Sequence, residues 1–149
     1  MIRRREFITL LGGAAAWPLA AHAQQRDRVW RIGVLTGLGE NDPVAKTIVS
    51  AFRQALAGLG WTDGRNIRMD FRLVDGDINR TRALAQELVS LQLDIIVTDV
   101  TPATAAVQRE TRTIPIVFVN LGDPVASGIV PALNHPGGNI TGFANLEAC

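Results

Sequence analysis

The stretch DIIVTDVTPATAAVQRETRTIPIVFVNLGD (residues 94–123) contains two apolar runs separated by an alanine-rich segment. Each run is short, continuous and rich in β-branched residues, which is typical of strands that are buried on both faces. Between the runs, Thr101 and Pro102 predict a cap-then-proline helix start, and the helix is expected to extend to about Arg112. This order of strand, helix and strand predicts two parallel strands joined by a crossover helix.

The same alternation is found earlier in the chain. RIGVLTGLG (residues 31–39) predicts a buried strand, and Asp42 and Pro43 predict the start of a helix that ends at Gly60. This helix is expected to have one apolar face, formed by Ile48, Phe52, Ala55, Leu56 and Leu59. NIRMDFRLV (residues 66–74) alternates apolar and polar residues, which predicts a strand near the edge of a sheet.

Three further elements complete the pattern. Asn79 is expected to cap a second helix, a short helix is expected around Pro124–Leu133, and a last strand is expected within PGGNITGFA (residues 136–144). Strict alternation of apolar strands and helices predicts an α/β fold, a doubly wound and mostly parallel sheet with helices on both faces. In such sheets ligands bind outside the carboxyl ends of the strands.

Hydroxyl, amide and carboxylate side chains follow these predicted strand ends. They are Thr36, then Thr98, Asp99 and Thr101, then Asn120 and Asp123. Thr hydroxyls and helix N-terminal N–H groups suit a carboxylate, and an aspartate suits an ammonium group, so this set fits a small zwitterion. Thr101 and Asp123 are also ordinary helix N-caps and Asn120 an ordinary turn residue, and both interpretations apply to the same positions.

The spacing of residues in this chain does not match the sequence motifs of several other functional classes. A dinucleotide site needs G-x-G-x-x-G, but Asp42 stands where the third glycine would follow Gly37 and Gly39. The only lysine, Lys46, is not preceded by a P-loop. A phosphoacceptor receiver would match Asp99 but lacks the acidic pair after the first strand. One histidine, His135, follows residue 23, so we expect no metal, cofactor or catalytic triad.

The first 23 residues predict a secretory signal peptide. An arginine-rich start precedes an apolar run that Pro18 interrupts and that is too short to span a membrane, and Ala21 and Ala23 form a small-x-small cleavage site. Arg4, Arg5 and Phe7 resemble the twin-arginine export motif, although the arginines also suit a general-secretion signal. We therefore expect cleavage before Gln24 and a periplasmic product that is not membrane-embedded.

Removing the signal peptide leaves the chain near neutral. Arg3, Arg4, Arg5 and Glu6 fall within it, so 12 Lys and Arg remain against 13 Asp and Glu. This balance gives no electrostatic reason to expect a nucleic-acid partner. The only cysteine is Cys149, so no intrachain disulfide is expected.

Three segments carry a resemblance to a known family. The leader RRREFITLLGGAAAWPLAAHAQ, the segment GDPVASG (residues 122–128) and the segment PGGNITG (residues 136–142) are similar to those of exported solute-binding proteins of ABC transporters. The similar subgroup is described as tryptophan/tyrosine-type. The resemblance implies a type I periplasmic-binding fold, in which two α/β lobes close on a small solute such as an amino acid and an ABC permease receives it.

The resemblance also implies site residues and a domain organisation. The matching ligand-binding positions are Thr36, Thr98, Thr101, Asn120 and Asp123. Family members are about twice as long as this chain, so residues 24–149 are expected to form an N-terminal lobe truncated near the first crossing between lobes. A single lobe lacks half of the closing contacts, and we therefore expect marginal stability and weak or no binding.

Two alternatives remain open. A sensor or interaction lobe that acts on a membrane partner would have the same strand-end residues. The second alternative is an enzyme that uses Asp99 and Asp123 as an acid–base pair. No histidine, lysine or cysteine lies near these two residues in the sequence to assist such a reaction. We expect a binding protein and not an enzyme.

Overall fold

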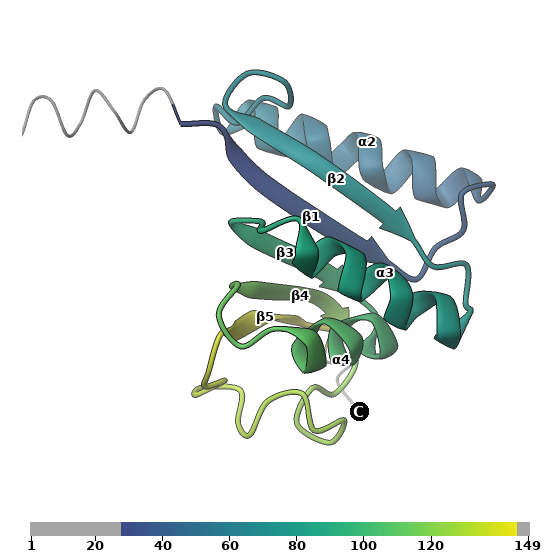
Figure 1. Cartoon of the computed structure of the whole chain (residues 1–149), viewed down its shortest axis with the longest axis vertical. Coiled ribbons are helices and arrows are strands. Elements are labelled where there is room, and N and C mark those ends of the chain that lie inside the picture. Colours follow the sequence, from purple (N-terminus) through teal and green to yellow (C-terminus); the bar gives the residue numbers. More distant parts are fainter. Residues whose placement is uncertain (1–27, 146–149) are drawn as a thin grey trace, which may run out of the picture.

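The computed structural model describes residues 28–145 as a five-stranded sheet with three helices. The strands and helices are β1 (Trp30–Thr36), α2 (Pro43–Gly58), β2 (Ile67–Leu73), α3 (Ile78–Ser90), β3 (Ile95–Asp99), α4 (Thr101–Glu110), β4 (Ile116–Leu121) and β5 (Ile140–Ala144). Their spatial order is β2-β1-β3-β4-β5, and every neighbouring pair is parallel (Figure 1). The predicted fold class is confirmed, and β2 lies at the edge as expected.

The helices divide unequally between the two faces of the sheet. Helices α3 and α4 lie together on one face, where they cover the larger apolar core (Figure 1). Leu35, Ile96 and Ile116, from three adjacent strands, are fully buried there. Helix α2 lies on the opposite face and shares a smaller cluster with Val34, Ile67 and Met69. No helix in residues 28–145 is long and apolar enough to cross a membrane.

The predicted apolar face of α2 is only partly buried. Phe52 and Leu56 pack against the smaller cluster, but Ile48 is 50% exposed and Leu59 is 75% exposed. Ala45, which is not among the named residues but lies on the same face three positions before Ile48, is the buried residue of this helix. The 3.6-residue period therefore identified the helix, but the extent of its burial depends on how much of the sheet lies beneath it.

Two predicted local details are wrong. Asp77, not Asn79, caps α3, because its carboxylate accepts hydrogen bonds from the backbone N–H groups of Asn79 and Arg80. The helix expected around Pro124–Leu133 is a series of turns. Gly128 has a φ of 70°, a left-handed conformation that ends the single helical turn begun at Pro124.

Gly142, in the middle of β5, lies directly beside β4. It pairs with Phe118, and a β-carbon at position 142 would overlap the Phe118 carbonyl oxygen. A clash with backbone is not relieved by rotating a side chain, so glycine is required for this pairing.

We predict that Gly142→Ala lowers the free energy of unfolding by roughly 1–3 kcal/mol, the usual cost of overpacking. Gly122→Ala is the matched control, since a β-carbon there meets no atom within 4 Å. The midpoints of urea unfolding, followed by circular dichroism, measure both effects. Equal midpoints for the two variants would contradict the conclusion that glycine is required at position 142.

Candidate functional site

The carboxyl ends of β1, β3 and β4 meet at one edge of the sheet, which we call the carboxyl edge. These strands are adjacent and parallel, so their last residues lie side by side. Thr36 ends β1, Asp99 ends β3, and Asn120 is the penultimate residue of β4. Thr101 follows as the first residue of α4. The structure therefore brings most of the predicted site residues to a single edge.

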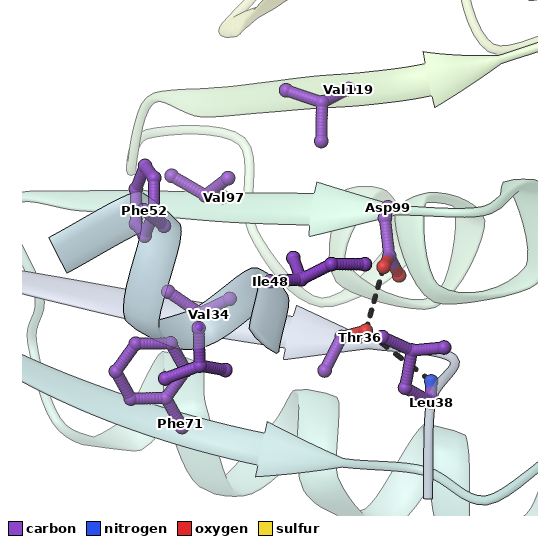
Figure 2. Close-up of a pocket in the computed structure, with 10 residues that line it drawn as sticks. Val34, Thr36, Leu38, Ile48, Phe52, Phe71, Val97, Asp99 and Val119 are labelled. Carbon is purple, nitrogen blue, oxygen red and sulfur yellow. Dashed lines mark hydrogen bonds between the residues drawn. The ribbon is translucent and has the colours of Figure 1, made fainter. Parts of the chain in front are cut away.

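Asp99 links the ends of β1 and β3. Its Oδ2 accepts a hydrogen bond from the Thr36 hydroxyl at 2.6 Å, and its Oδ1 accepts one from the Gly37 backbone N–H at 2.7 Å. The Thr36 hydroxyl also accepts a bond from the Leu38 N–H, as Figure 2 shows. Asp99 forms no ion pair with any other residue in the described part of the chain. A carboxylate has about four acceptor positions, so it retains capacity for a further donor.

Thr98 points away from the carboxyl edge. Its side chain is 0% exposed, and its hydroxyl is 2.8 Å from the Thr104 hydroxyl on α4. The Thr104 hydroxyl in turn lies 3.0 Å from the Val100 carbonyl oxygen, to which it donates. In this arrangement Thr98 holds the start of α4 against β3 and offers no group to a ligand outside the sheet.

The start of α4 is uncapped. Val100 occupies the N-cap position with a φ of 51°, and no side chain accepts a hydrogen bond there. Thr101 was predicted as the cap, but it is already the first helical residue. A left-handed conformation is unusual for a β-branched residue and costs backbone energy. Pro102 has no N–H, so the first-turn N–H groups that have neither a partner within the helix nor a capping side chain are those of Thr101 and Ala103, where α4 begins at the carboxyl edge.

Asn120 has the second left-handed conformation at this edge, with a φ of 58°. The register of β4 against β5 shifts between Val119 and Leu121, so Asn120 bulges out of the ladder. Its side chain is exposed, and its Oδ1 accepts a hydrogen bond from the Asn145 amide at 3.4 Å. The bulge directs this amide outward beside the end of β5.

Asp123 lies two residues beyond β4. Its Oδ1 accepts hydrogen bonds from the backbone N–H groups of Val125 and Ala126, at 3.1 and 2.9 Å. The carboxylate is therefore an N-cap for the turn that follows, as one of the two sequence interpretations proposed. It remains exposed to solvent.

Sequence reasoning placed Val100 and Gly37 at the strand ends but assigned neither residue a role. Val100 is 38% exposed, and a β-carbon on Gly37 would lie 2.8 Å from its Cγ2 atom. Nothing in the sequence marks a valine as left-handed, so this contact had no readable signal. Among the described residues, no group of three or more metal-ligating side chains is close enough to hold a metal ion.

Comparison with known proteins identifies relatives of this chain. The family model for the ABC transporter substrate binding protein matches residues 32–149. A curated relative, the tyrosine-binding protein of Clostridioides difficile, is 38% identical over 94 residues. The match covers 63% of this chain and 27% of the relative, so this chain spans only part of that protein.

Solved structures of similar fold include one that is named as a substrate-binding protein. The ligand-free, open structure of a substrate-binding protein with adhesive properties from Clostridium difficile has a TM-score of 0.73 and 32% identity, covering 80% of this chain and 40% of that one. An ABC domain from Streptococcus pneumonia in complex with L-Trp has a TM-score of 0.70 and 28% identity, covering 78% and 38%. The curated relative and the first of these structures are named as binding proteins, and the family model covers residues 32–149, so the chain belongs to the ABC transporter substrate-binding protein family.

Proposed function

We propose that this chain binds a small solute, such as an amino acid, at the carboxyl edge as part of an ABC import system. The observation that supports this most directly is the uncapped start of α4 beside the Asp99 carboxylate. A helix N-terminus favours a carboxylate, and an aspartate favours an ammonium group, so the pair complements both charges of an amino acid. The tyrosine-binding and L-Trp-bound relatives support the same ligand class.

The proposed contacts to the solute come from Asp99, Thr101 and Asn120. Thr36 orients Asp99 through their hydrogen bond, Thr101 offers a hydroxyl beside the first N–H groups of α4, and Asn120 offers its amide. Val100 forms an apolar wall between them. Asp123 lies farther along the edge, where its capping bonds leave the carboxylate exposed. Thr98 contributes by fixing α4.

A second lobe, a membrane permease and an export signal would complete the proposed import system. In the type I arrangement, a second lobe would supply the other ligand contacts, and residues 28–145 would act as one lobe. An inner-membrane ABC permease would receive the solute. Residues 1–23 would direct export to the periplasm and be cleaved before Gln24; this segment lies outside the described residues.

We predict that Asn120→Gly weakens solute binding by about tenfold, because it removes one hydrogen-bonding amide. Glycine accepts the left-handed backbone at position 120, so the fold is retained. NMR titration of the labelled full chain with amino acids measures the effect and suits weak binding.

The matched control for this prediction is Gln92→Gly. Gln92 is also left-handed, with a φ of 53°, but it follows α3 at the opposite end of the sheet. We expect the Gln92→Gly variant to bind the solute with the same affinity as the unchanged chain. Solute-induced shifts near Gln92, or equal affinities for both variants, would contradict a site at the carboxyl edge.

We also predict that the double substitution Arg4→Lys and Arg5→Lys blocks export while keeping the positive charge. A twin-arginine signal is read by a receptor that requires the arginine pair, whereas a general-secretion signal requires only positive charge. Cell fractionation with sequencing of the mature N-terminus measures export and cleavage, and Arg3→Lys is the matched control. Normal export of the double variant would exclude the twin-arginine route.

A further inference from the structure

A cavity of about 120 Å³ lies between α2 and the sheet and extends toward the carboxyl edge. Figure 2 shows its floor, to which β1, β2, β3 and β4 each contribute one apolar side chain, and the α2 side chains above it. The floor residues are Val34, Phe71, Val97 and Val119, and the α2 residues include Ile48 and Phe52. The cavity therefore has almost entirely hydrocarbon walls.

The polar side chains at the cavity lie at one end. Thr36 and Asp99 line it there, and they are hydrogen-bonded to each other and to the Gly37 and Leu38 N–H groups. Deeper in the cavity, the lining offers no partner for a polar group. Burying a polar group without a partner weakens binding, so the interior favours a group with no polar atom.

We propose that this cavity is a subsite for the hydrocarbon side chain of the solute, with phenylalanine as the best-fitting amino acid. The assignment rests on the proposed function, because the amino and carboxylate groups would remain at the carboxyl edge near Asp99 and Thr101. A dry, apolar cavity of about 150 Å³ accommodates benzene, so this slightly smaller space suits one six-membered ring and excludes an indole. The hydroxyl of a tyrosine would find no partner inside.

The position of the cavity also suits one solute held at both ends. Asp99 lines the cavity and belongs to the carboxyl edge, so a side chain inside the cavity and an ammonium group outside it would meet at this residue. Ile48 is half exposed at the cavity wall. A ligand ring would cover it and supply contacts that α2 lacks.

The test uses benzene as the first probe, with the full chain labelled at methyl groups. We expect intermolecular NOEs from benzene to the methyl groups of Val34, Val97 and Val119. Val97→Phe fills the floor of the cavity and is expected to weaken benzene binding by about tenfold or more. The matched control is Val117→Phe. Val117 pairs with Val97 on the same face of the sheet but lies outside the cavity, so benzene binding should be unchanged.

The second arm uses amino acids. Phenylalanine is expected to displace benzene and to bind at least about tenfold more tightly than tryptophan, and Val97→Phe should remove this preference. Absence of benzene NOEs in the unchanged chain would overturn the cavity as a binding site, whether or not the variants fold. Equal phenylalanine affinity in Val97→Phe and Val117→Phe would overturn the subsite but leave the proposed function intact. If benzene binds and no amino acid shifts the carboxyl edge, both the solute assignment and the proposed function fail.

Discussion

Parallel pairing of every neighbouring pair of strands is the constraint on which the rest of this structure depends. A parallel strand cannot follow its neighbour through a tight turn, so the chain must cross the sheet between β1, β2, β3 and β4, and helices α2, α3 and α4 make these crossings. The same constraint gathers all the carboxyl ends at one edge. Thr36, Asp99 and Asn120 are far apart in the sequence and come together for this reason alone.

The aspartates at the two ends of the sheet have different kinds of partner. At the amino end, Asp94 pairs with Arg28 and accepts a hydrogen bond from the Arg31 N–H, while the Arg31 side chain reaches Asp70 at 3.5 Å. At the carboxyl edge, Asp99 has backbone and hydroxyl partners and no cation among the described residues. A carboxylate without a resident cation is suited to receive a cationic group from a ligand. The contrast supports assigning the two ends different roles.

The two faces of the sheet also differ, in how completely helices cover them. The face beneath α3 and α4 holds the larger cluster of buried apolar residues. The opposite face has only α2, whose Ile48 is half exposed, and Leu59, just after the helix, is mostly exposed. Phe143, on β5, is 73% exposed. The apolar cavity follows from this incomplete cover, and it lies beside the edge where a ligand is proposed to bind.

The order of elements and the parallel α/β fold were determined by the sequence itself, because apolar runs and cap signals are local properties. DIIVTDV and IPIVFVNLGD were enough to predict two buried neighbouring strands, and Asp42 with Pro43 marked the start of α2 correctly. Only the tertiary structure decided which way each strand-end side chain points. Thr98 and Asp99 are consecutive, yet the pleat buries one against α4 and turns the other toward Thr36. The positive φ of Val100, where the chain leaves β3 for α4, and of Asn120, where β4 bulges beside β5, likewise has no signal in the linear pattern of residues.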